Sequence, residues 1–153
     1  ASHMGVVVIL CGGLVGNLAG VTGSMELHEG ETTYAIAAEE GGMFPLGFAV
    51  RLDRFQVEHF GSDPGDVKSF RSRLAILEGG REVLQGNVEV NHPLPYKGWL
   101  FYQANYSADD PTYSGFLAVK DPGLPWVFAG FVMIVAGAVF VFYIRPRLGG
   151  LTP

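Results

Sequence analysis

The stretch LPWVFAGFVMIVAGAVFVFYI, residues 124–144, contains 21 residues without a charged side chain, and Arg145 and Arg147 follow it directly. At about 1.5 Å of rise per residue, a helix of this length spans about 31 Å, close to the ~30 Å hydrocarbon core of a bilayer. Such a helix satisfies its own backbone polar groups, as the bilayer core requires. Because cations favour the cytoplasmic side, residues 145–153 are expected to form a cytoplasmic tail. The chain before the span is then extracytoplasmic.

A second apolar segment lies near the start of the chain. Residues 5–22 carry no charged side chain, so we predict a first transmembrane helix there. Gly12, Gly16 and Gly20 recur every four residues and line one face of that helix. A glycine face lets another helix approach closely in lipid. Since the second span carries only Gly130 and Gly137, the partner helix can belong to another chain.

The first four residues have two interpretations. Residues 1–4, ASHM, resemble a remnant of an expression vector, or they begin the first span. A secretory signal is disfavoured, because no lysine or arginine precedes Gly5.

Residues 23–123, between the spans, have a different composition. They hold all 15 acidic residues and eight of the ten basic ones, which leaves a net charge of −7. An acidic domain argues against a nucleic-acid partner, because phosphate binding needs clustered cations. The chain has a single cysteine, Cys11, so this domain must be stabilised by its own core rather than by an internal disulfide.

The patterns in this domain predict strands. Residues 48–52 alternate apolar and other side chains, and the alternation shifts by one near Asp53 and Arg54, which indicates a β-bulge. Gly79-Gly80 separates two apolar runs and predicts a type I′ or II′ hairpin. No helical periodicity of useful length occurs in the domain. We therefore expect a mainly β extracytoplasmic domain, a sandwich or an open barrel of about six to eight strands, flanked by two transmembrane α-helices.

Two loops are expected, at residues 39–45 and 61–66. The first ends in apolar Met43 and Phe44. Burial of both in the core is favoured over contact with lipid or with a partner.

No catalytic motif occurs in the sequence. It lacks a nucleophile elbow, a phosphate-binding loop, paired C-x-x-C cysteines and a zinc-protease motif. Asp109 and Asp110 with Asp121 do not match the spacing of a calcium loop, and the histidines share no metal-ligand spacing. We expect no metal site and no catalysis by this chain alone.

The strongest motif is VNHPLPYKG, residues 90–98, with Phe101-Tyr102-Gln103 after it. It resembles the signature of the ResB family of cytochrome c biogenesis proteins, and residues 47–55, 70–72 and 120–125 resemble other segments of that family in the same order. The matching motif residues, to which we assign a structural role, are Asn91, Pro93, Leu94, Tyr96, Gly98, Phe101, Tyr102 and Gln103. Because family members are usually longer, the chain corresponds to a fragment or a reduced member.

The resemblance implies a role in System II cytochrome c maturation. The expected partners are a ResC-type haem-handling membrane protein, apocytochrome c and the lipid bilayer, and haem is the cofactor that the complex handles. The family has a histidine near the start of the corresponding span, followed by an apolar residue and glycine, and His3-Met4-Gly5 matches that pattern. His3 is thus a candidate axial ligand, unless it belongs to a vector remnant.

The alternative function is a membrane-tethered β domain that binds or anchors a soluble partner without a haem role. Trp99, Tyr102, Tyr106 and Tyr113 are the aromatic residues that could serve that interface, although most of them are expected to form the core. The identity of the partner separates the two hypotheses.

Overall fold

The computed structural model describes residues 2–59, 67–89, 91–107 and 109–149. The chain divides into two compact units, a β domain over Val21–Lys120 and a helical unit made of Ala1–Gly20 and Asp121–Pro153. The predicted loop 61–66, Ala1, Val90 of the family motif and the last four residues of the predicted tail lie outside the described residues.

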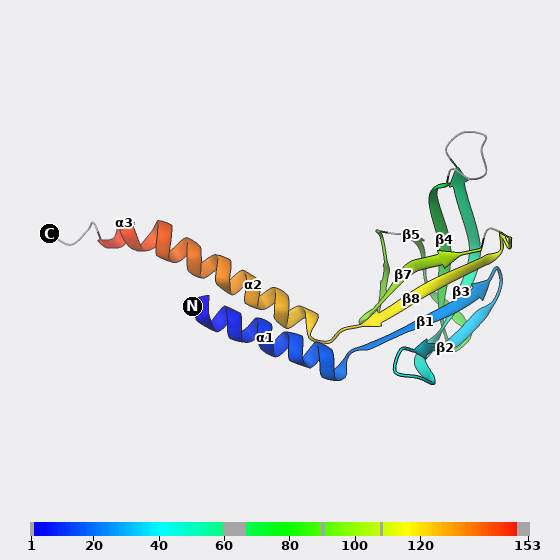
Figure 1. Cartoon of the computed structure of the whole chain (residues 1–153), viewed down its shortest axis with the longest axis horizontal. Coiled ribbons are helices and arrows are strands. Elements are labelled where there is room, and N and C mark those ends of the chain that lie inside the picture. The colour runs from blue at the N-terminus through cyan, green and yellow to red at the C-terminus, as the bar shows by residue number, and fades with distance from the viewer. Residues whose placement is uncertain (1, 60–66, 90, 108, 150–153) are drawn as a thin grey trace. The chain divides into compact units, whose positions relative to one another are not determined.

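All strands in the described part of the β domain belong to one antiparallel sheet, coloured from blue to yellow in Figure 1. The sheet has eight strands in the order β5-β4-β3-β2-β1-β8-β7-β6. Their bounds are β1 Val21–His28, β2 Thr32–Ala38, β3 Met43–His59, β4 Val67–Glu78, β5 Arg81–Glu89, β6 Leu94–Tyr96, β7 Trp99–Tyr106 and β8 Tyr113–Lys120.

The two ends of this sheet approach each other, so the sheet is nearly closed into a barrel. The backbone groups of Glu89, at the end of β5, and of His92, just before β6, exchange two hydrogen bonds of 3.1 Å. The side chain of Leu94 in β6 fills the space where a Cβ of Gly86 in β5 would lie. Of the two predicted forms of the β domain, a sandwich and an open barrel, the sheet topology therefore supports the open barrel.

Two local predictions are confirmed. The register between β3 and β4 shifts between Leu52 and Arg54, at the position of the predicted bulge. Gly79 and Gly80 have φ values of 56° and 78° and join β4 to β5, so the hairpin turn is of type I′. Positive φ at both positions favours glycine, which explains why this pair marks the turn.

The core follows from the alternation of side chains along the strands. In β7, Trp99, Phe101 and Gln103 are buried, whereas the residues between them are only partly covered. Phe101 and Phe116 are the largest fully buried side chains. Burial of each such side chain contributes about 1.5–3 kcal/mol, so apolar packing stabilises the domain without a disulfide.

One expectation about the core is wrong. Met43 is 68% exposed and Phe44 is 37% exposed. They begin β3 directly after the β2–β3 turn, opposite Ala37 and Ile36, where the sheet ends and few side chains remain to cover them. Phe44 is partly covered by Trp99, with 5.9 Å between the ring centroids.

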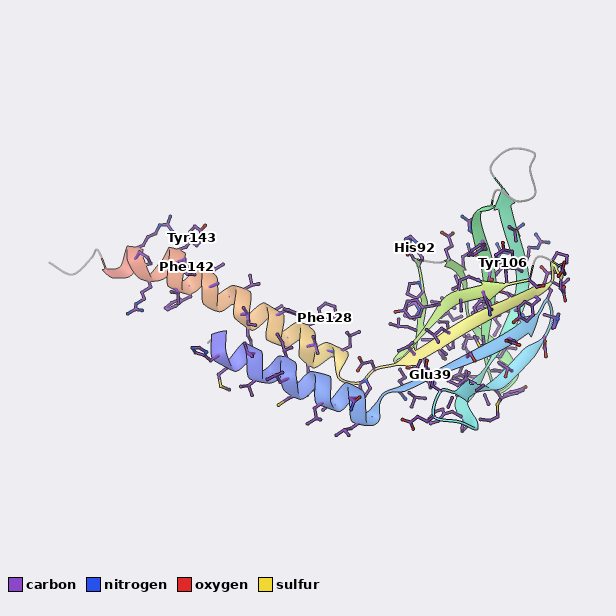
Figure 2. All side chains as sticks on the ribbon, viewed as in Figure 1. Glu39, His92, Tyr106, Phe128, Phe142 and Tyr143 are labelled. Carbon is purple, nitrogen blue, oxygen red and sulfur yellow. The ribbon has the colours of Figure 1, made fainter. Side chains whose placement is uncertain are left out.

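The helical unit contains α1 (Ser2–Ala19), α2 (Leu124–Val139), a π-helical segment η1 (Phe140–Ile144) and α3 (Arg145–Gly149). Among the described residues, the run Leu124–Arg147 is long and apolar enough to cross a membrane, while the apolar helix His3–Ala19 is shorter. Phe128, Phe142 and Tyr143 project outward from this run and are exposed (Figure 2). β1 begins at Val21, inside the range predicted for the first span.

Candidate functional site

Within the helical unit, Gly5 and Gly12 of α1 face α2, Gly16 faces Asp121 just before α2, and the two helices lie side by side in Figure 1. A Cβ at Gly12 would lie 2.9 Å from both the carbonyl oxygen of Gly123 and the backbone nitrogen of Val127. A Cβ at Gly16 would lie 2.5 Å from the Asp121 carboxylate, and the Gly20 N–H donates to the carbonyl oxygen of Gly16 at 2.8 Å. In this structure the helix that packs on the glycine face therefore belongs to the same chain.

The sequence pattern did not indicate that Gly5 and Gly130 also belong to this contact. A Cβ at Gly5 would lie 2.8 Å from the carbonyl oxygen of Gly130, and a Cβ at Gly130 would lie 2.7 Å from the carbonyl oxygen of Gly5. The sequence does contain a signal for this contact, because a spacing of seven residues separates Gly5 from Gly12 and also Gly123 from Gly130. Residues seven apart return to the same helix face after two turns.

The histidine candidates differ in their surroundings. His3 lies in the first turn of α1 with an exposed side chain. His92 is in the corner between β5 and β6, where its side chain is 81% exposed and its Nδ1 lies 4.0 Å from the Glu89 carboxylate (Figure 2). Among the described residues, no group of three or more metal-ligating side chains converges.

The family motif bends the chain from β5 through β6 into β7. Lys97 has a φ of 46° and Gly98 a φ of 81°, which forms a tight turn between β6 and β7. Leu94 is buried against Gly86, and Tyr96 packs edge-on against Phe48 with 4.9 Å between the ring centroids. The motif residues of this corner thus fix the position of the β6–β7 turn on the domain.

The remaining motif residues lie inside the barrel or beside it. Tyr102 is half-buried, whereas Phe101 and Gln103 are buried. The Gln103 side chain accepts a hydrogen bond of 2.5 Å from Ser72 Oγ in β4 and donates one of 2.6 Å to Ser114 Oγ in β8. The two serine hydroxyls lie 3.1 Å apart. This polar network joins strands that are far apart in the sheet order, and its side chains are satisfied.

A groove lies at the end of the sheet that carries the β4–β5 and β6–β7 turns, and we call it the hairpin-end groove. Its volume is about 540 Å³. Its apolar walls come mainly from β3, and Tyr34 on its border is 70% exposed. The lining residues are Tyr34, Pro45, Gly47, Phe48, Ala49, Leu77, Glu78, Gly79, Gly80 and Lys97.

Glu78 is the charged centre of this groove. Its Oε1 accepts hydrogen bonds from the Tyr96 hydroxyl, at 2.8 Å, and from the Lys97 ammonium. The hydrogen bond from Lys97, followed by that from Tyr96, lowers the pKa of Glu78. The same carboxylate raises the pKa of Lys97, mainly through their hydrogen bond. The family motif is thereby held against the β4–β5 hairpin.

This ion pair predicts a pH dependence of stability. Because the pKa of Glu78 is lower in the folded state, the native protein binds fewer protons and the pair stabilises above the unfolded pKa. We expect the thermal unfolding midpoint to fall as the pH drops below the usual glutamate pKa of about 4.3. Glu78→Gln should make this fall smaller, and Glu40→Gln, which removes an exposed carboxylate from the β2–β3 turn, should leave it unchanged. Identical pH profiles for Glu78→Gln and the unchanged protein would refute this role.

The groove is suited to binding rather than to bond making. Its walls offer aromatic and aliphatic surface with one carboxylate–ammonium pair, a composition typical of sites that bind apolar ligands or peptides. Sequence reasoning identified the motif side of the groove but not Tyr34, Phe48 or Glu78. The sequence showed the glycines of the β4–β5 turn and the alternation in β3. Neither pattern indicates that β3 and this turn lie next to the family motif.

The comparisons with known proteins agree with the resemblance in the motif. Residues 1–112 match the model of the ResB-like family. Two similar proteins are both named cytochrome c biogenesis protein CcsB. The one from Synechococcus sp. (strain JA-3-3Ab) is 34% identical over 110 residues, and the one from Thermosynechococcus vestitus is 33% identical over 108 residues.

These alignments cover 70% and 68% of this chain but 22% and 24% of the two relatives. The chain therefore spans about a quarter of the length of the relatives that it matches. The range matched by the family includes α1, the corner motif and every residue that lines the hairpin-end groove.

Proposed function

The chain belongs to the ResB-like family, and from this membership we propose that it is a membrane-anchored subunit of a cytochrome c maturation complex. It works in a System II pathway with a ResC-type haem-handling protein and delivers haem to apocytochrome c. The observation that carries the proposal is the family match over residues 1–112, supported by relatives named for cytochrome c biogenesis. Thioether formation is a property of the complex, to which this chain contributes binding surfaces.

We propose that the helical unit anchors the protein in the cytoplasmic membrane. The length and apolar character of Leu124–Arg147 support one crossing. The close packing of α1 on α2 supports a second crossing, because paired glycine faces are a main mode of helix association in lipid. With Arg145 and Arg147 on the cytoplasmic side, the β domain is extracytoplasmic.

The hairpin-end groove is the proposed docking surface for a polypeptide segment of the complex. Its apolar walls can accept an extended chain, and the exposed ring of Tyr34 offers the kind of aromatic anchor that recurs at protein interfaces. The Glu78–Lys97 pair adds a polar group that orients such a segment.

His3 is the proposed contact of this chain with haem. Histidine nitrogen is a common axial ligand of haem iron, and the exposed His3 side chain provides one such donor. The described residues that line the groove include no histidine, cysteine or methionine, so the groove is not the proposed haem site. Haem bound at His3 would be the group that the complex transfers. A Soret band of the purified complex should weaken in His3→Ala but not in His92→Ala.

Affinity purification of the full chain from membranes, solubilised in a non-ionic detergent, tests the proposal. We expect a polytopic ResC-type protein to co-purify. Tyr34→Ser should weaken the binding of this partner roughly 30-fold, since loss of one aromatic anchor costs about 2 kcal/mol. Val83→Ser, at an exposed apolar position outside the groove, is the matched control. Recovery of an unrelated soluble partner instead would support the tethering module and reject the maturation role.

A further inference from the structure

Arginine side chains gather on the outer face of β3 and β4, away from the hairpin-end groove. Arg54 of β3 lies directly opposite Arg73 of β4, and the next outward pair is Gln56 and Arg71. All four side chains are exposed. Together with Asn87 of β5, they line a recess of about 70 Å³. Alternation along the strands places these groups on one face, because residues two apart point the same way.

Among the residues that the structure describes, one of the three arginines of this recess has a carboxylate within 4 Å, and Asp53 interacts with Arg73 from farther away. Arg71 Nε lies 2.6 Å from a carboxylate oxygen of Glu89. Within the part of the chain that the structure describes, Arg54 and Arg73 have no carboxylate within 4 Å. The carboxylate of Asp53 is already bound by Arg51 at 2.5 Å and by Gln85 at 2.7 Å.

Electrostatic repulsion between Arg54 and Arg73 destabilises the protein when no ligand is bound. Like charges directly opposite in an antiparallel pair are destabilising. This arrangement occurs in a β domain (Val21–Lys120) whose net charge is −6, so the recess is a local positive site on an acidic domain. An anion bound between Arg54 and Arg73 would turn the repulsion into attraction.

We propose that this recess binds a single oxyanion, a phosphate or a carboxylate group. Guanidinium groups present paired N–H donors that match the oxygens of both groups. The amides of Gln56 and Asn87 supply further donors, and the described residues that line the recess include no acidic side chain that would repel the ligand. Since one water occupies about 30 Å³ in the liquid, the volume suits one small anionic group.

The oxyanion can come from two sources, free phosphate or the carboxylate of a larger molecule. The recess is open on an exposed sheet face, so the rest of a larger ligand can extend into solvent. Inorganic phosphate and acetate are the two probes that separate these sources.

Isothermal titration calorimetry of the full chain in a non-ionic detergent, at low ionic strength, tests the site. We expect saturable binding of at least one probe with a dissociation constant on the order of millimolar. Tighter binding of phosphate assigns the site to phosphate, and tighter binding of acetate assigns it to carboxylates. Arg73→Gln should weaken the binding roughly tenfold or more, as expected when one charged donor is lost.

The matched control is Arg81→Gln, which makes the same change of charge at an exposed position in the β4–β5 hairpin. It should leave the affinity within about twofold, because at long range its charge is screened. If Arg73→Gln does not yield folded protein, Arg54→Gln tests the same pair. Absence of saturable binding for both probes, or an equal loss in Arg81→Gln and the site variant, would overturn the proposal.

Discussion

Replacing Gln103 with leucine is expected to destabilise the β domain by about 2–3 kcal/mol. The substitution keeps the approximate volume of the side chain but removes the amide oxygen that accepts from Ser72 and the amide nitrogen that donates to Ser114. The serines are fully buried, so part of their hydrogen-bonding capacity would face an apolar group. Each buried polar group that loses its partner costs about 1–3 kcal/mol. The remaining contact between the two hydroxyls limits the loss.

The loss can be measured by urea unfolding of the full chain, followed by the near-ultraviolet circular dichroism of the buried aromatic residues. Gln56→Leu is the matched control, because it makes the same substitution at an exposed position of β3. Surface changes of this kind usually alter stability by less than about 0.5 kcal/mol. Equal midpoints for the two variants would show that the network does not stabilise the barrel.

The second large effect is expected in the helical unit. Gly12→Leu should push α1 away from α2, because even the first side-chain carbon would lie 2.9 Å from backbone atoms of Gly123 and Val127. Backbone atoms cannot move aside as a flexible side chain can, so the helices must separate or tilt. Overpacking of this kind costs about 1–3 kcal/mol or more.

Distances between spin labels at Leu10 and Val132 report this change, with Cys11 replaced by serine. Both labelled positions are exposed and lie one on each helix. We expect a longer and broader distance distribution in Gly12→Leu. Gly13→Leu is the control, because a Cβ at Gly13 meets no atom within 4 Å. An unchanged distribution in Gly12→Leu would contradict the observed packing.

Several elements could be predicted from the sequence because local chemistry determines them. The uncharged run before Arg145 indicated a long apolar helix, and helices cover residues 124–149. The frame shift near Asp53 gave the bulge, and Gly79-Gly80 gave the turn with positive φ at both residues. In each case the signal lies within one continuous stretch of the sequence.

Other features depend on which strands meet, and no local pattern carries that information. The alternation of β7 marked Gln103 as inward-facing, but not that Ser72 and Ser114 would surround it. Glu78 resembled any residue before a hairpin turn until the register brought Tyr96 and Lys97 to it. Met43 and Phe44 were expected in the core because they are apolar, whereas their position at the start of a strand leaves them exposed.

The central claim is that this protein serves cytochrome c maturation. The most direct test deletes its gene and measures haem covalently attached to membrane c-type cytochromes, by haem staining after denaturing electrophoresis. We expect the stained bands to disappear and to return when the unchanged gene is supplied. Bands of full intensity in the deletion strain would contradict the account.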